Sequence, residues 1–320
     1  MKDLWVEKYR PKTVNEYVFK DADQKRQVEG WVTDGGIPHL LFSGAPGTGK
    51  TTLAKVLIND LNVEKADVLT INASRDNGVE MIRKKITAFS ETMPWGDFKI
   101  ILLDEADHIS PEGQAALRGV MEQYASVVRF ILTCNYPNMI IPAIHSRCQG
   151  FHITSQDQVD FTARVAEILI TEGVEPSIDD LDLYVKATYP DLRKTINTVQ
   201  MNVVDNVLRT LEQESSGGDW KINMVALFRE NKIREARKLI TQSARPDEYN
   251  DIFKFLYRNL EFFGKNVDQQ DEAVIVIRNG MVKHTQVADP EITGEVYKNT
   301  WLKRYSICEK NRRPANLYRF

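Results

Sequence analysis

A short segment near the start of the chain has the residue types and spacing of a phosphate-binding loop. Residues 44–51 (GAPGTGKT) match the pattern G-x-x-x-x-G-K-[ST] at every fixed position, after an apolar run and before a helical stretch. The glycines let consecutive backbone N–H groups turn toward one point, which makes an anion site at the start of a helix. We expect Lys50 to reach the β- and γ-phosphates of ATP and the Thr51 hydroxyl to bind Mg²⁺. The predicted ATP-binding residues of this loop are Gly44, Pro46, Gly47, Thr48, Gly49, Lys50, Thr51 and Thr52.

A pair of carboxylates follows an apolar run about fifty residues further on. Asp104 and Glu105 come directly after residues 100–103 (IILL). A buried strand ending there would place Asp104 beside the nucleotide, where it can hold Mg²⁺ through water, and Glu105 could polarise the attacking water. Together with the phosphate loop, the pair predicts ATP hydrolysis. We expect Asp107 and His108, which follow, to lie in a solvated loop without a role.

The elements that must position these residues alternate in the rhythm of a parallel sheet covered by helices. Candidate strands are residues 40–42, 68–71, 100–103 and 127–132. Such short continuous apolar runs are typical of strands buried on both faces. A helix should begin after Ser110, because serine caps helices and the proline that follows suits the first turn.

The pattern changes to helices alone after residue 154. We expect helices over about 157–172, 178–189 and 191 to beyond 211, then a linker at residues 215–218 (SSGG). The remainder is expected to be helical, with breaks near residues 245–246, 264 and 289–290. The predicted fold class is α/β, with a phosphate-loop domain, a helical lid and a helical C-terminal domain. The predicted domains are residues 1–155, 156–217 and 218–320.

Composition excludes several classes of protein. A hydrophobic fraction of 42% with 27% charged residues is ordinary for a globular chain, and no apolar run is long enough to cross a bilayer. The three cysteines are widely spaced and form no C-x-x-C pair, so we expect neither a zinc site nor disulfides. A net charge of -3 argues against a uniformly basic nucleic-acid binder but leaves room for a local basic patch. We expect a cytoplasmic protein, or one of the host cytoplasm if it is viral.

Four further segments, taken with the phosphate loop and the acidic pair, resemble the clamp-loader branch of the AAA+ family. Residues 5–12 (WVEKYRPK) are similar to the segment that wraps the adenine in that family, and residues 133–136 (TCNY) resemble its sensor 1. Residues 146–148 (SRC) match the short motif of the clamp loaders, and residues 190–197 (PDLRKTIN) resemble sensor 2. The sequence resembles most closely the large subunit of T-even-type bacteriophage clamp loaders. The archaeal and eukaryotic replication factor C small subunits are a close second.

The resemblance implies roles for several side chains. The base and ribose pocket would be lined by Val6, Tyr9, Arg10 and Val18. Asn135 would probe the γ-phosphate or its water, and Arg193 would point back at the phosphates from the lid. Arg147 would act in trans on the ATP of a neighbouring subunit, where it neutralises charge developing on the transferred phosphoryl group. The catalytic residues implied are Lys50, Glu105, Asn135, Arg147 and Arg193.

A basic cluster lies on the helix expected to begin near Gly78. The apolar residues that fall on one side of this helix are Val79, Ile82, Ile86 and Phe89. That pattern leaves Lys84 outward and Arg83 on the flank. A solvated face with an i, i+4 pair between Glu80 and Lys84 explains the same residues without a ligand.

In the family that the sequence resembles, the start of this helix and of the next one tracks the DNA backbone. The implied phosphate contacts are Arg75, Arg83, Lys84, Gln114 and Arg118. Asn72 would couple DNA binding to Glu105.

By this resemblance, the chain would be an ATPase subunit of a sliding-clamp loader. Its expected partners are other copies of itself and a smaller companion subunit in a pentamer, the sliding clamp and primer–template DNA. ATP binding would open the clamp, and DNA would trigger hydrolysis and release. The alternatives are another AAA+ ATPase that remodels DNA (a helicase loader or branch-migration motor), a helicase, a small-molecule kinase, and a non-catalytic scaffold subunit. Arg147 and the lid argue against a kinase, the absence of a second motor domain argues against a helicase, and the intact acidic pair argues against a scaffold.

Overall fold

The computed structural model describes residues 3–75, 79–154, 156–209, 220–230, 232–244, 248–260 and 266–284. The chain divides into two compact units, residues 1–208 and 209–320. The first unit holds all the sequence motifs identified above. The division into three domains with boundaries at 155 and 217 stays a prediction.

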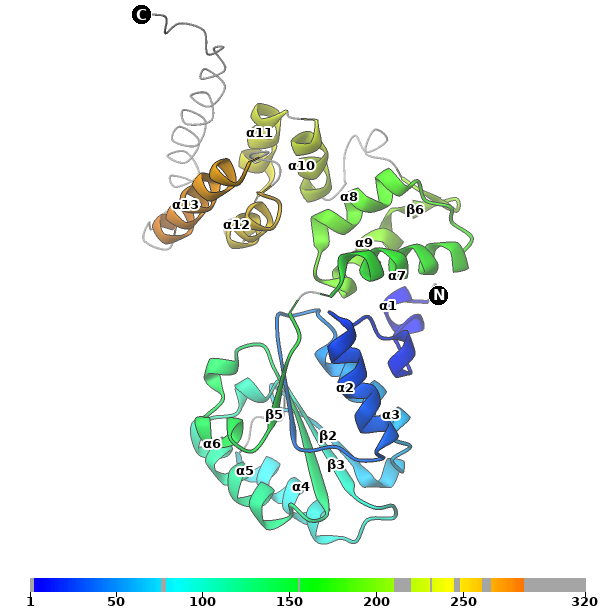
Figure 1. Cartoon of the computed structure of the whole chain (residues 1–320), viewed down its shortest axis with the longest axis vertical. Coiled ribbons are helices and arrows are strands. Elements are labelled where there is room, and N and C mark those ends of the chain that lie inside the picture. Colours follow the sequence, from blue (N-terminus) through cyan, green and yellow to red (C-terminus); the bar gives the residue numbers. More distant parts are fainter. Residues whose placement is uncertain are drawn as a thin grey trace, which may run out of the picture. The chain divides into compact units, whose positions relative to one another are not determined.

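A five-stranded sheet forms the centre of the first unit (Figure 1). Its strand order is β2-β3-β4-β1-β5, and all neighbouring strands pair in parallel. The strands are β1 (Leu40–Ser43), β2 (Val68–Asn72), β3 (Lys99–Asp104), β4 (Val128–Cys134) and β5 (Gln149–His152). The four predicted strands are confirmed. The edge strand β5 was not predicted, because only Phe151 of its four residues is buried and no apolar run marks it.

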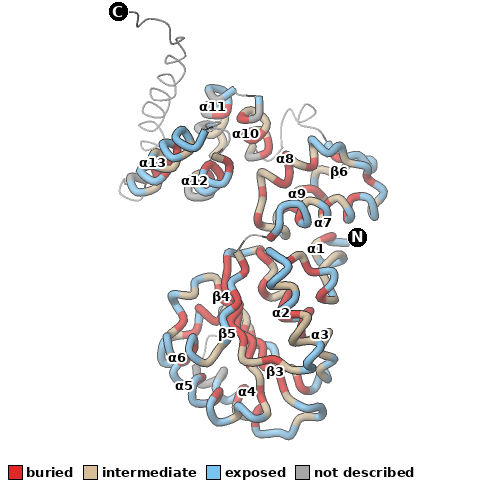
Figure 2. The backbone as a smooth tube through the Cα atoms, in the orientation of Figure 1, coloured by how far each residue is buried: buried red, intermediate tan, exposed pale blue. Residues whose placement is uncertain are grey.

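Both faces of this sheet are buried, which explains the continuous apolar runs. On β3, Ile100 and Leu102 pack toward one cluster, while Ile101 and Leu103 pack toward the other. Helices α2 (Ala22–Thr33) and α3 (Lys50–Asp60) cover the first face, and α4 (Val79–Glu91) and α5 (Pro111–Gln123) cover the second (Figure 1). The strands are therefore the most deeply buried part of this unit (Figure 2).

Short elements complete the α/β part of the unit. They are α1 (Trp5–Lys8), α6 (Pro142–His145) and the 3₁₀ turns Val14–Glu16, Lys65–Asp67, Ala106–His108 and Pro137–Met139. The start of α5 is as predicted: the Ser110 hydroxyl accepts the N–H of Gly113 at 3.2 Å, and proline takes the first helical position. These contacts fix where α5 begins.

Three helices follow the sheet, as predicted, and each has a side-chain cap. They are α7 (Gln158–Thr171), α8 (Ile178–Thr188) and α9 (Leu192–Asn202), capped by Asp157, Ser177 and Asp191. The prediction that the third helix continues beyond residue 211 was wrong. The helix ends at Asn202, and a hairpin of β6 (Val203–Val204) and β7 (Val207–Leu208) follows it. Asp205 and Asn206 make its two-residue turn with φ of 52° and 59°, a conformation that these residue types favour.

The described part of the second unit is helical, as predicted. Its helices are α10 (Trp220–Arg229), α11 (Ile233–Ser243), α12 (Tyr249–Arg258) and α13 (Val267–His284). The rings of Phe228 and Phe255 lie 6.4 Å apart between their centroids, and Gly280 packs closely on Phe253. The predicted linker at 215–218 and the breaks at 245–246, 264 and 289–290 lie outside the described residues. Within the described helices of both units, none is long and apolar enough to span a membrane.

Candidate active site

The phosphate loop joins β1 to α3 and has no room for side chains at its glycines. Gly47 and Gly49 have φ of 77° and 93°, in the left-handed region that glycine tolerates. A Cβ on Gly44 would lie 2.0 Å from the carbonyl oxygen of Ile153, and one on Gly47 would lie 2.1 Å from Oδ1 of Asp191. The loop is therefore a backbone cradle at the start of a helix, which is the arrangement that suits a chain of phosphates.

Lys50 is buried and turns its ammonium group onto its own loop. Its Nζ donates to the carbonyl oxygens of Gly44 at 2.9 Å and of Ala45 at 2.7 Å. Burial lowers the pKa of Lys50, and the neighbouring acidic groups of Asp107 and Asp104 partly offset this effect. An anion in the cradle would satisfy the same ammonium group.

Asp104 is held by two hydroxyl groups from neighbouring elements. Its Oδ1 accepts hydrogen bonds from Thr51 Oγ1 and Thr133 Oγ1, each at 2.6 Å. The backbone N–H of Glu105 donates to Thr133 Oγ1 at 3.0 Å, and Glu105 has a φ of 57°, which is unusual outside glycine. The oxygens of Thr51 and Asp104 are hard ligands in the same place, so they fit Mg²⁺. No group of three or more His, Cys, Asp or Glu side chains suited to a metal occurs in the described part of the chain.

Asp107 is not in a solvated loop, so that prediction was wrong. It is buried, and its Oδ2 accepts the backbone N–H groups of Asn135 and Tyr136, each at 3.0 Å. The turn at Ala106–His108 packs Ala106 into the core, and this carries Asp107 inward with it. Asp107 thus fastens the segment after β3 to the turn that carries Asn135. The apolar positions on both sides, Ala106 and Ile109, were the signal available in the sequence.

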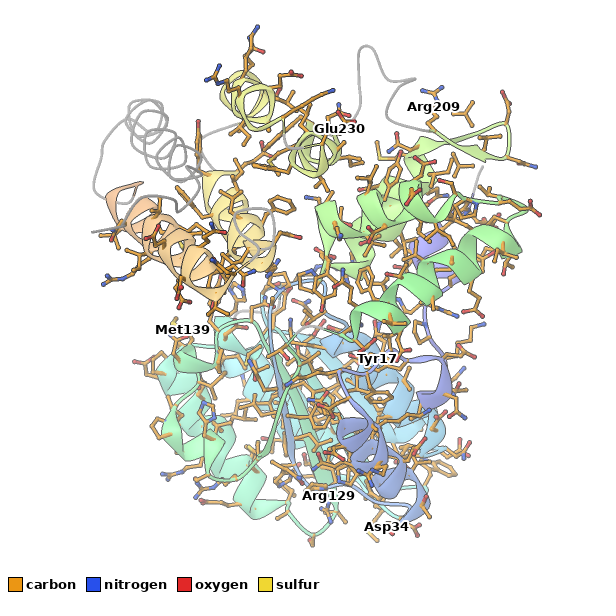
Figure 3. The ribbon with its side chains drawn as sticks, turned by 45° about the horizontal axis from the view of Figure 1, so that its top comes forward. Tyr17, Asp34, Arg129, Met139, Arg209 and Glu230 are labelled. Carbon is orange, nitrogen blue, oxygen red and sulfur yellow. The ribbon has the colours of Figure 1, made fainter. Side chains whose placement is uncertain are left out.

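The residues expected around the base lie together in one pocket. Val6, Tyr9, Arg10 and Val18 line it with Gly47, Gly49, Thr52 and Arg193. The pocket therefore joins the N-terminal segment, the phosphate loop and the start of α9. Tyr17 was not predicted here, yet its hydroxyl donates to the carbonyl oxygen of Thr48 at 3.3 Å, and burial raises its pKa. Figure 3 shows Tyr17 at the end of the α/β layers that faces helices α7 to α9.

The N-terminal segment is tied to the helices of the lid. Tyr9 Oη and Lys8 Nζ donate to the same oxygen of Glu172, at 2.6 and 2.7 Å. These two hydrogen bonds, that from Lys8 first, lower the pKa of Glu172. A guanidinium N–H of Arg164 donates to the carbonyl oxygen of Tyr9 at 3.1 Å, and the N–H of Trp5 donates to Gln200 at 3.1 Å. One wall of the base pocket is thus anchored to α7 and α9.

Arg147 lies just beyond α6 and is held by its own chain. A guanidinium N–H donates to the carbonyl oxygen of Ala143 at 2.7 Å, and the guanidinium also pairs with Glu122 of α5. The same carboxylate lies 3.9 Å from Nε of Arg118. The contacts that the structure gives Arg147 are to α5 and α6, and its role at a neighbouring subunit's nucleotide stays a prediction.

Four of the five expected DNA contacts are exposed, and one is not. Arg75, Arg83, Lys84 and Arg118 are exposed. Gln114 is only 2% exposed: its amide nitrogen donates to the carbonyl oxygens of Ile109 and Met139, and its amide oxygen accepts the N–H of Ile141. We therefore correct the expectation for Gln114, which supports a loop inside the protein and is not free to contact phosphate.

Helix α4, which carries the basic cluster, agrees in part with the predicted apolar and polar sides. Ile86 is buried, and Phe89 packs against the same core. The side chains of residues 76–82, including Glu80, lie outside the described residues. Asn72 uses its side-chain oxygen to accept the N–H of Ser74 at 3.0 Å and the hydroxyl of Ser74 at 2.6 Å. This bonding shapes the turn after β2, and the coupling role of Asn72 stays a prediction.

Fold and site together define an ATPase of the AAA class. A family model described as "ATPase family associated with various cellular activities (AAA)" matches residues 40–155. The chain is 38% identical over 248 residues to the replication factor C small subunit of Methanococcus vannielii, covering 74% of this chain and 78% of that relative. It therefore belongs to the replication factor C small subunit family.

Further relatives match a shorter stretch. The replication factor C small subunits of Archaeoglobus fulgidus and Aeropyrum pernix are 44% and 45% identical over 202 and 204 residues. In these matches the chain spans 63% and 62% of the relative's length. The relatives support the second of the two resemblances; the likeness to the bacteriophage subunit stays a prediction.

Solved structures show the same fold at low identity. A variant of Thermotoga maritima RuvB has a TM-score of 0.51 and 16% identity, over 61% of this chain and 66% of that one. The structure titled as the RuvB Holliday junction branch migration motor of the same organism has a TM-score of 0.50. This likeness concerns the fold alone.

Proposed function

We propose that this chain is an ATP-hydrolysing subunit of a sliding-clamp loader in DNA replication. The observation that carries the ATP-hydrolysing part of the proposal is the chain of hydrogen bonds from Thr51 through Asp104 and Thr133 to the backbone of Glu105. It ties the phosphate loop to the residue that would activate water. The clamp-loader part of the proposal is supported by membership of the replication factor C small subunit family.

Each residue of the site has a defined task in this proposal. The loop N–H groups and Lys50 bind the phosphates, and Glu105 orients the attacking water and takes up its proton. Mg²⁺, which Thr51 and Asp104 would hold, supplies neutralisation of charge on the phosphate oxygens. Asn135, which follows β4, and Arg193 of α9 would contact the terminal phosphate. The rate of hydrolysis depends on the position of the attacking water. The backbone turn that fixes Glu105 would therefore favour hydrolysis.

The assembly would complete the site. Arg147 would act on the ATP of the next subunit, held in place by Glu122 until it does so. Copies of this chain and a smaller companion would form the loader, which binds the clamp and primer–template DNA in the cytoplasm. The exposed cations of α4 and α5 would follow the phosphate backbone without reading sequence. Hydrolysis would then release the clamp on DNA.

A clamp-transfer assay tests this function. The chain, assembled with its companion subunit, is mixed with a labelled candidate clamp, primed circular DNA and ATP, and DNA-bound clamp is separated by size. We expect clamp on the DNA with ATP and none with a Lys50→Ala assembly. ATP turnover without any transfer of clamp would contradict the clamp-loader proposal while leaving the ATPase intact.

A further inference from the structure

Gln156 is a buried polar residue in the wall of the base pocket. It is 4% exposed and lines the pocket together with Val6, Tyr9 and Val18. Its backbone carbonyl accepts the hydroxyl of Tyr189 at 2.6 Å, which fixes the residue at the start of the lid. Its side-chain oxygen Oε1 is buried and has no hydrogen-bond partner among the described residues.

A buried amide oxygen without a partner is unfavourable and uncommon in folded proteins. Three other polar side chains of the pocket wall are already engaged. Tyr9 Oη donates to Glu172, Arg10 pairs with Glu7 at 2.6 Å, and Arg164 pairs with Glu167 at 2.7 Å. Gln156 therefore brings a buried acceptor that has no hydrogen-bond partner to this wall.

A glutamine amide presents an acceptor and a donor side by side. The edge of adenine offers the complementary pair, the N6 amino group as donor and a ring nitrogen as acceptor, and glutamine pairs with adenine in this way elsewhere. Guanine and hypoxanthine carry an oxygen at that position. Rotation of the Gln156 amide can bring its NH2 group to that oxygen, so the discriminating base is unsubstituted purine, which offers the Gln156 oxygen no donor at position 6.

We propose that Gln156 contacts the base and selects adenine by pairing with its N6 amino group. This inference rests on the proposed ATP site. It assigns base selection to a side chain of the lid segment, which also carries Arg193, so the same segment contacts both ends of the nucleotide.

The test compares three nucleotides on the assembled protein. ATP, ITP and purine riboside triphosphate share their sugar and phosphates and differ at position 6, which carries an amino group, an oxygen or hydrogen. Equilibrium titration gives the dissociation constant of each for the wild type and for Gln156→Leu. We expect the wild type to prefer ATP over purine riboside triphosphate by roughly 5- to 100-fold, and over ITP by less. In Gln156→Leu that preference should fall at least about fivefold, because the partner of N6 is lost.

Val6→Ala is the matched control, since it removes apolar contact in the same pocket from any purine. It should weaken all three nucleotides alike and leave their ratios unchanged. An unchanged preference for ATP in Gln156→Leu, with binding intact, would overturn the inference. If circular dichroism shows that Gln156→Leu does not fold, Gln156→Met is measured instead, because methionine is similar in shape to glutamine. Failure of the wild type to bind any of the three nucleotides would refute the proposed ATP site itself.

Discussion

Single side chains decide whether the phosphate loop can work. The Lys50 ammonium contacts two carbonyl oxygens of its own loop, and burial removes most of its water. A triphosphate would offer stronger, charge-assisted hydrogen bonds than these neutral carbonyls. Lys50 is therefore poised to exchange loop carbonyls for phosphate oxygens when nucleotide binds.

Lys50→Ala should weaken ATP binding by about 10- to 100-fold or more, the range expected for a lost hydrogen bond to a charged group. Lys55→Ala is the control, because Lys55 is an exposed lysine on the same helix. Equilibrium titration with ATP measures both. Equal affinities for Lys50→Ala and Lys55→Ala would refute the role given to Lys50.

Asp107 holds the Asn135 turn, so its loss should affect turnover more than ATP affinity. Asp107→Leu leaves the part-buried N–H groups of Asn135 and Tyr136 without this acceptor, which should cost roughly 1 to 3 kcal/mol of stability. Asp107→Asn keeps an acceptor oxygen and should retain most of the stability and rate. Denaturant unfolding, with kcat and KM measured separately, checks this. Equal kcat in wild type and Asp107→Leu would mean that the turn needs no such support.

At the residue level, the sequence motifs predicted where side chains lie in the fold, while the roles of these side chains stay predictions; where burial decided, the prediction was wrong. The residues of the loop and the acidic pair could be placed from spacing alone. Gln114 looked like an outward polar residue, but the fold turns it inward to bond three backbone groups. Gln156 and Tyr17 carry no motif, and only the packing of separate segments brings them to the pocket.

At the scale of elements, α4 presents a run of exposed cations. Arg83 and Lys84 are exposed, while Ile86 on the same helix is buried. If this face follows a DNA backbone, Arg83→Ala with Lys84→Ala should weaken binding alike for all sequences. Each lost phosphate contact should make the slope of log K against log salt shallower by about 0.9.

The control for α4 is Lys25→Ala with Arg26→Ala, which removes two adjacent exposed or half-exposed cations from α2. DNA affinity of the ATP-loaded assembly is measured across a salt series for both pairs. A solvated face on α4 would give the same affinity and slope for both double variants. That result would remove α4 from the DNA site.

Helices and strands that an apolar run or a capping residue marks in the sequence could be predicted, and those without such a feature could not. Four strands stand out as apolar runs, and α5 stands out by its cap. β5 is an edge strand with one buried residue, so no apolar run in its sequence marks it as a strand. Its extended conformation is stabilised by its pairing with β1. The hairpin after α9 interrupts an expected helix, because Asp205 and Asn206 adopt left-handed conformations that a helix does not allow.

At the scale of the whole molecule, the first unit supplies all the residues of the proposed ATP site except the arginine that would act from a neighbouring subunit. The loop, Asp104, Glu105 and Arg193 come from one chain, while the contacts of Arg147 are to α5 and α6. A ring in which each Arg147 reaches the next subunit's ATP would supply the missing charge. The central claim is therefore that the working site lies between subunits.

Mixing two inactive variants tests this claim most directly. Arg147→Ala should retain ATP binding and lose about 10³-fold in turnover, as expected for an arginine finger. Glu105→Gln should also bind ATP without turning it over. Steady-state ATP hydrolysis is measured while the two variants are assembled at varied ratios with the companion subunit and DNA. We predict recovery of activity in the mixtures, because some interfaces then combine an intact Glu105 with an intact Arg147. No recovery at any ratio would contradict a site shared between subunits.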